Sequence, residues 1–168
     1  MNIKNYTSDV PVSTTIGRIQ TFLLECKVNG LTMEYDGFGG ISALLFHIDL
    51  DRRYSVRMTA NVDAVQDTFW HEYAGADRIA KTSDGDEHLP YNGRKRLRKS
   101  SFRQQAERTA WRLQQDWLEV QMSLLRLQKV DFLQVFLPYL WDGKTTFYHR
   151  LKEGGMLALP SSKTEGAA

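Results

Sequence analysis

Apolar residues recur between Ser100 and Gln128 with the spacing of one long amphipathic helix. The steps alternate between four and three residues, the heptad pattern of helices that pack against other helices. The first row is Ala106, Ala110, Leu113, Trp117, Val120, Leu124 and Leu127. The second row is Trp111, Leu118, Met122 and Leu125. The opposite, solvent-compatible face is Gln104, Glu107, Arg108, Gln115, Glu119 and Gln121. A helix about 40 Å long with two apolar rows requires burial by a sheet, by a subunit or by both.

Upstream patterns predict an antiparallel sheet. Apolar and polar residues alternate over residues 31–36 and 53–60, and the more apolar residues 41–50 between them fit a more deeply buried strand. The sequences DGFGG and DLDRR are short connections, so the three strands form a meander. We expect helices to cover its apolar face, while Ser55 and Arg57 point from the other face to solvent or to a ligand.

The remaining elements are helices. One is expected from Ser13 to Asn29, a second after the N-cap residue Asn61, and short helices after Asp131 and near residue 146. The fold class is therefore α+β: an N-terminal helix, a three-stranded antiparallel meander, a helix, a long amphipathic helix and two shorter C-terminal helices. Residues 1–160 are expected to form a single domain with a mobile loop at 75–93, and residues 161–168 a disordered tail.

Composition limits the cellular setting. The 168 residues are 42% hydrophobic and 25% charged, as in ordinary globular domains, and no apolar run is long enough to cross a bilayer. The first residues lack the pattern of a signal peptide. Cys26 is the only cysteine, so no internal disulfide can form, and a reducing cytoplasm is expected.

Motifs for catalysis, metals and cofactors are not apparent in the sequence. The four histidines have no metal-ligand spacing, and GFGG precedes a strand and not the helix that a phosphate loop requires. No G-x-S-x-G nucleophile motif is found. We expect a protein without catalytic residues, metal or cofactor, although an active site assembled from dispersed residues is an open alternative.

The segment RKRLRKSSFR carries the clearest candidate site. Six of its ten residues are basic, against a net charge of +2 for the chain. These cations are Arg94, Lys95, Arg96, Arg98, Lys99 and Arg103. Cations at a helix start oppose its dipole, a cost that a bound anion would relieve. Phosphates of a nucleic acid or a nucleotide are the expected ligands, with Arg57 as a further contact. A merely solvated helix start is the alternative.

The apolar rows also predict self-association, because they exceed what a small sheet can cover. The expected interface residues are Trp117, Leu124, Leu127, Phe132 and Phe136. Which of the two rows faces the sheet is left open by the pattern.

Five stretches resemble a family of small proteins of phages, prophages and other mobile elements. They are NYTSDVPVSTTIGRIQ, YDGFGGISALLFHIDL, ANVDAVQDTFWHEY, QAERTAWRLQQDWLEVQMSLL and VDFLQVFLPYLWDGKTTFY. The family has no established activity, so the resemblance carries over no catalytic or binding residues. It implies a bacterial host cytoplasm and a purpose tied to the mobile element.

We therefore expect a non-enzymatic binding protein that counteracts a bacterial antiviral defence. It would bind a nucleic-acid-bearing defence complex or sequester a nucleotide messenger, and it would contact no membrane. One alternative is a DNA- or RNA-binding accessory protein of phage replication. The other is a hydrolase with a dispersed active site.

Overall fold

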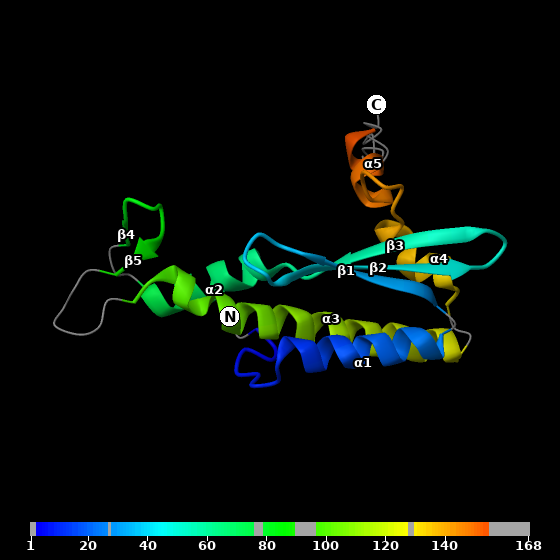
Figure 1. The fold of residues 1–168 in the computed structure, drawn as a ribbon, viewed down its shortest axis with the longest axis horizontal. Coiled ribbons are helices and arrows are strands. Elements are labelled where there is room, and N and C mark those ends of the chain that lie inside the picture. The colour runs from blue at the N-terminus through cyan, green and yellow to red at the C-terminus, as the bar shows by residue number, and fades with distance from the viewer. Residues whose placement is uncertain (1–2, 27, 76–78, 90–96, 128–129, 155–168) are drawn as a thin grey trace, which may run out of the picture.

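The computed structural model describes residues 3–26, 28–75, 79–89, 97–127 and 130–154 (Figure 1). It has the predicted α+β architecture. The elements are α1 Val12–Glu25, β1 Asn29–Tyr35, β2 Ile41–Asp49, β3 Arg53–Thr59, α2 Val62–Ala74, β4 Ala80–Lys81, β5 Glu87–His88, the 3-10 helix η1 Lys99–Phe102, α3 Arg103–Arg126, α4 Phe132–Phe136, the 3-10 helix η2 Leu137–Tyr139 and α5 Phe147–Glu153. None of the described helices combines the length and apolar composition needed to span a membrane. The tail predicted at 161–168 lies outside the described residues.

The strands β1, β2 and β3 form the predicted antiparallel meander. In the register of β2 and β3, Phe46 lies opposite Val56 and His47 opposite Ser55. Because successive residues of a strand face opposite sides, one face is apolar and the other polar. The apolar face carries the buried residues Leu44, Phe46, Ile48, Val56 and Met58. The polar face includes His47, Ser55 and Arg57, as the sequence predicts for the last two.

The helices α1 and α3 cover the apolar face and run side by side in the same direction (Figure 1). An ion pair between Glu25 and Arg126 joins their C-terminal ends. The buried core residues of α3 include Trp111, Leu118 and Met122. Trp111 is also anchored to the sheet, since its Nε1 donates to the carbonyl of Ile41 at 2.9 Å. The second apolar row is therefore the one that faces the core.

The first row of α3 is covered over only part of its length. Ala106 and Ala110 are buried against α2. Further along the helix, Val120 and Leu127 are 57% and 67% exposed. Leu113 and Leu124 are half-buried. One end of this heptad row thus packs within the chain, and the other end is largely open.

The position of α4 corrects one predicted interface residue. A capping box of Asp131 and Gln134 starts this helix, and it places Phe136 fully inside the core. The Phe136 ring meets the rings of Phe46 and Trp117 edge-on, with centroids 5.8 Å apart in each pair. A fully buried side chain has no surface to offer a partner. Phe136 is a core residue, and its assignment to the oligomer interface is wrong.

Gln115 also departs from its prediction as a solvent-facing residue. It is buried on the core side of α3. Its Nε2 donates to Glu119 at 2.6 Å, and its Oε1 accepts from Arg112 at 3.1 Å. These bonds satisfy the hydrogen-bonding groups of the buried amide. The polar residue type alone therefore did not indicate that Gln115 is buried.

Part of the segment predicted as a mobile loop, residues 75–93, forms a short hairpin. Its strands β4 and β5 pair antiparallel, and Gly85 turns the chain between them with a φ of 84°. Strands of two residues are too short to show an alternating pattern. The sequence pattern therefore did not indicate this hairpin, and the mobility of residues 75–93 stays a prediction.

The chain after α4 returns to the edge of the sheet. Leu140 bridges Val56 of the edge strand β3, and the Trp141 N–H donates to the Ser55 carbonyl at 2.8 Å. From this anchor α5 stands away from the layers of α1, α3 and the sheet (Figure 1). The segment around Trp141 therefore forms a wall beside β3.

Replacing Phe136 with alanine should lower the free energy of unfolding by about 3–5 kcal/mol, because it leaves a cavity in the core. The matched change is Leu137→Ala at its partly exposed neighbour, which should cost about 1 kcal/mol. Urea denaturation followed by circular dichroism measures both. Equal losses at the two positions would contradict the placement of Phe136.

Candidate anion-binding pocket

The predicted basic segment lies only partly within the described residues. Three of its cations are outside them: Arg94, Lys95 and Arg96. Arg98 forms an ion pair with Asp84 at 3.6 Å, and Lys99 pairs with Asp67. The hydrogen bond to Asp67 raises the pKa of Lys99, although burial opposes this. The cations that the structure describes here are therefore already neutralised by carboxylates of the same chain.

The acidic hairpin β4–β5 is one source of this neutralisation. The Asp86 carboxylate accepts from the N–H of Ser100 at 3.3 Å and from its hydroxyl at 2.6 Å. His88 forms an antiparallel bridge with Arg98. The uneven charge of the sequence thus corresponds to two segments that fold against each other.

Arg103 occupies the centre of a second acidic cluster. Its guanidinium donates to Asp36 at 2.9 Å and to Glu107 at 3.3 Å, and it also pairs with Asp63. Burial alone would lower the pKa of Arg103, but these hydrogen bonds raise it above its usual value. The side chain ties the β1–β2 turn and the start of α2 to the start of α3. The contacts indicate a structural role for this predicted phosphate ligand.

Arg57 is likewise engaged on the polar face of the sheet. Its Nε and Nη2 donate to Glu34 at 2.9 and 2.6 Å, which links β3 to β1 across β2. Its guanidinium also lies 5.1 Å from the ring centre of Trp141. Arg57 therefore supports the wall formed by the returning chain.

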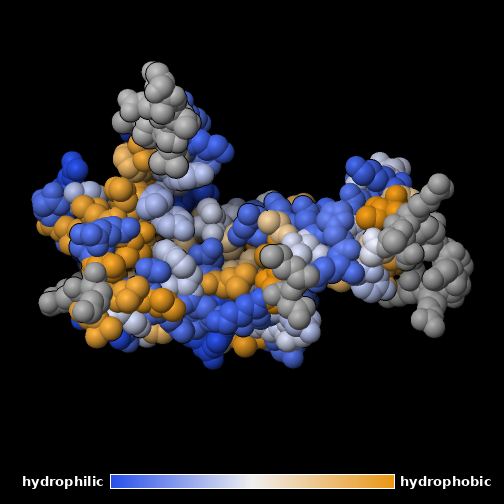
Figure 2. Space-filling view, turned by 180° about the vertical axis from the view of Figure 1, so that it is seen from behind, coloured by the Kyte–Doolittle hydropathy of each residue, from blue (hydrophilic) through white to orange (hydrophobic). Residues whose placement is uncertain are grey.

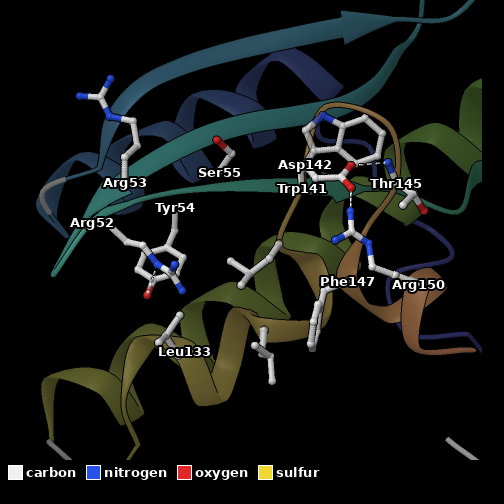
Figure 3. A pocket seen from close by; sticks show the side chains of 12 residues that line it. Arg52, Arg53, Tyr54, Ser55, Leu133, Trp141, Asp142, Thr145, Phe147 and Arg150 are labelled. Atoms are coloured by element: carbon white, nitrogen blue, oxygen red, sulfur yellow. Dashed lines mark hydrogen bonds and ion pairs between the residues drawn. The ribbon is translucent and has the colours of Figure 1, made fainter. Parts of the chain in front are cut away.

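A pocket of about 560 Å³ opens beside this wall (Figure 3). Its lining comes from the start of β3, from α4 and η2, and from the segment between Leu140 and Arg150. Tyr54 points from β3, and Arg52 from the turn before it, toward Leu133, and Arg150 reaches in from α5 beside Asp142. The volume lies within the usual range for small-ligand sites.

Positive charge predominates in the lining. It contains Arg52, Arg53 and Arg150 against the single carboxylate of Asp142. Arg150 pairs with Asp142, and Arg53 pairs at 2.9 Å with Asp49 outside the pocket. Arg52 forms no ion pair with a carboxylate in the part of the chain that the structure describes, although the charge of the neighbouring Asp51 acts on it. Its Nε donates to the Tyr54 hydroxyl at 3.0 Å, which raises the Arg52 pKa, and its guanidinium lies 5.1 Å from the centre of that ring.

The rest of the lining is apolar and held in place by local hydrogen bonds. Leucine and aromatic side chains make it up: Leu133, Leu137, Leu140, Trp141 and Phe147. The turn after Trp141 is fixed by Asp142, whose Oδ1 accepts from the N–H groups of Lys144 and Thr145 at 2.8 Å each. An apolar surface bordered by guanidinium groups suits a ligand that has both a planar ring and an anionic group.

Sequence reasoning did not identify this pocket. Arg52 and Arg53 were visible only as part of the turn after β2, and Arg150 only as part of a short last helix. The available signal was a pair of adjacent arginines between two strands. The return of the chain to β3, which brings Arg150 close, depends on contacts far apart in sequence.

A histidine and a serine meet on the polar face of the sheet. His47 Nδ1 lies 2.9 Å from Ser55 Oγ, and Ser55 also lines the pocket. These residues are cross-strand partners, so the contact follows directly from the register. It is nevertheless the arrangement in which a histidine can take a proton from a serine hydroxyl. Among the described residues, no group of three or more His, Cys, Asp or Glu side chains could hold a metal ion.

Comparison with known proteins adds no family or relative. The chain matches no model of a protein family, and neither the curated proteins nor the solved structures give a significant match. The functional assignment therefore depends on the arrangement of the side chains.

Stability should depend on pH through Asp36. Burial raises the pKa of this carboxyl, but hydrogen bonds from the Phe38 and Gly40 N–H groups and from Arg103 outweigh burial and lower it overall. Its contribution should be complete above about pH 4 and lost as the pH falls through the lowered pKa. Asp36→Asn should melt below the wild type at pH 6, and the difference should shrink toward pH 2.

Calorimetric melting between pH 2 and pH 6 measures this effect. Asp9→Asn, at an exposed site, is the control and should follow the wild type throughout. A difference for Asp36→Asn that stays constant with pH would show that its charge makes no contribution.

Proposed function

We propose that the protein is a non-enzymatic binding protein that sequesters a compact nucleotide in the pocket beside β3. The nucleotide would be a messenger of a bacterial antiviral defence, which the protein counteracts on behalf of a phage or other mobile element in the host cytoplasm. The observation that carries the proposal is Arg52, a cation without a carboxylate partner among the described residues, beside an apolar and aromatic lining.

The pocket chemistry supports a nucleotide in particular. A nucleobase offers a flat apolar face that fits against Trp141, Phe147 or the leucines. Its phosphates would accept hydrogen bonds from Arg52 and Arg150, since guanidinium groups bind phosphate oxygens in pairs. Phosphate binding at Arg150 would compete with Asp142. Arg52 needs no such exchange, and it is the stronger anchor.

The same reasoning makes a DNA or RNA strand a weaker candidate ligand than a compact nucleotide. Binding to Arg98, Lys99 or Arg103 would have to replace an existing ion pair. The remaining cations, Arg94, Lys95 and Arg96, stay predicted phosphate contacts. The density of charge in the sequence favours them, because six of the ten residues from Arg94 to Arg103 are basic. A DNA- or RNA-binding accessory protein is therefore the second candidate function.

The hydrolase alternative is carried only by the contact between His47 and Ser55. An acyl or phosphoryl ester would have to reach the Ser55 hydroxyl from the pocket. Turnover of a bound nucleotide at trace protein concentration, abolished by Ser55→Ala, would select this alternative over sequestration.

The proposed function also includes self-association of the protein into a homo-oligomer.

Isothermal titration calorimetry with ATP, GTP, cyclic di-AMP and cyclic di-GMP tests the nucleotide proposal. At least one should bind, and Arg52→Gln should weaken that binding by about 10- to 100-fold through loss of a charge-assisted contact. Arg18→Gln removes the same charge from an exposed site on α1 and should change affinity less than about twofold.

The proposal fails if none of the four nucleotides binds below about 1 mM, or if both variants lose affinity equally. An unchanged mixture after overnight incubation, analysed by chromatography, distinguishes sequestration from hydrolysis.

Salt dependence separates the pocket from a polymer site. If the basic segment follows a single strand, log affinity for a 20-nucleotide oligomer should fall with log salt by about 0.7 per phosphate contact. Replacing Arg94, Lys95, Arg96, Arg98 and Lys99 with glutamine should then abolish oligomer binding. We expect the replacement to leave nucleotide binding at the pocket unchanged, with folding checked by circular dichroism. A parallel loss of nucleotide binding would place the ligand at the basic segment.

A further inference from the structure

We propose that a second copy of the chain docks on the open part of the first row of α3. This open stripe consists of Leu113, Val120, Leu124 and Leu127. The inference rests on the homo-oligomer that is part of the proposed function. It names the surface through which the two copies would meet. The stripe shares no residue with the nucleotide pocket.

The stripe is the continuation of a row that packs against a helix within the chain. Ala106 and Ala110 of the same row are buried against α2. Beyond them the heptad spacing continues, but Val120 and Leu127 are exposed by 57% and 67%. Seven residues separate these two, so they lie on the same side of the helix. The row thus has the geometry of a helix contact. In its second half Trp117 packs against Phe136 and Tyr139, whereas Val120 and Leu127 stay exposed among the described residues.

The flanking residues favour a copy of the same helix as the partner. The positions that border the stripe include Gln114, Asp116, Gln121 and Ser123. Three of these side chains are uncharged, and the Asp116 carboxylate is already paired with Lys4 and Arg112 of the same chain. Two identical stripes can therefore approach with little repulsion, and a strongly charged partner would gain little there.

Additional apolar surface lies next to the stripe. Figure 2 shows hydrophobic side chains gathered at the end of the molecule where α4 and the C-terminal part of α3 lie. Trp117 and Phe132, both predicted at the interface, are half-buried at this end. Surface of this kind is the usual centre of a contact between subunits.

The size of the stripe sets the expected affinity. From Leu113 to Leu127 the helix extends about 21 Å, and a helix face is about 10 Å wide. The stripe alone therefore offers about 200 Å², less than the roughly 800 Å² per partner of a stable interface. Even with the neighbouring apolar surface, we expect a reversible dimer whose population rises with concentration.

Sedimentation equilibrium tests this dimer. The average mass should rise from near the chain mass of 19.4 kDa toward twice that value between about 10 and about 500 µM. Leu127→Glu should abolish the rise. Leu24→Glu is the matched control, because Leu24 is an equally exposed leucine, at 69%, but lies on α1 beside Val28 and Leu31. Wild type that stays monomeric to 500 µM, or equal effects of the two variants, would overturn the proposal.

Cross-linking supplies a direct readout of the same contact. Val120 lies at the middle of the stripe, so it meets its own copy whichever way the helices run. In a Cys26→Ser background, Val120→Cys should form a disulfide-linked dimer under mild oxidation, and Leu24→Cys should not. Equal cross-linking at both positions would count against the stripe. Nucleotide binding by Leu127→Glu should be unchanged, which separates failure of the dimer from failure of the pocket.

Discussion

Burial of the second row of α3 against α1 and the sheet is the constraint on which the other elements depend. Trp111, Leu118 and Met122 fix the rotation of the helix, and the bond from Trp111 to Ile41 fixes its position along β2. Once the rotation is set, the first row lies beside the core, where Trp117 packs at its edge against Phe136. One end of that row meets α2, and the other remains open. The surface available for self-association is therefore a consequence of how the core is filled.

The type and order of the main elements could be predicted from local periodicity, because amphipathic helices and alternating strands carry their pattern within a few turns or residues. The choice between the two rows of α3 could not be predicted, since both have helical spacing. Gln115 and Phe136 show the same limit. A glutamine can be buried when neighbouring side chains satisfy its amide, and a phenylalanine in a short helix can face either the core or a partner. Only the tertiary neighbours decide.

The candidate site was less predictable than the fold. The sequence pointed to residues with the greatest density of charge, but density does not show whether a cation has a partner. Asp84 and Asp67 come from other parts of the chain and meet Arg98 and Lys99 only after folding. Conversely, Arg52 and Arg150 are unremarkable in the sequence. They line one pocket because Leu140 and Trp141 attach the end of the chain to β3.

The cost of basic residues at the start of α3 is relieved by anions of the protein itself. Arg103 in the first turn opposes the helix dipole, yet Asp36, Asp63 and Glu107 surround it. A ligand phosphate would gain little there, because it would displace carboxylates already in hydrogen-bonding contact. At Arg52 the guanidinium donates to the Tyr54 hydroxyl and lies over that ring, and it forms no ion pair with a carboxylate of the described residues, although the charge of Asp51 acts on it. An incoming anion adds a charged contact at that position without breaking one, and for this reason the pocket beside β3 is the stronger candidate for phosphate binding.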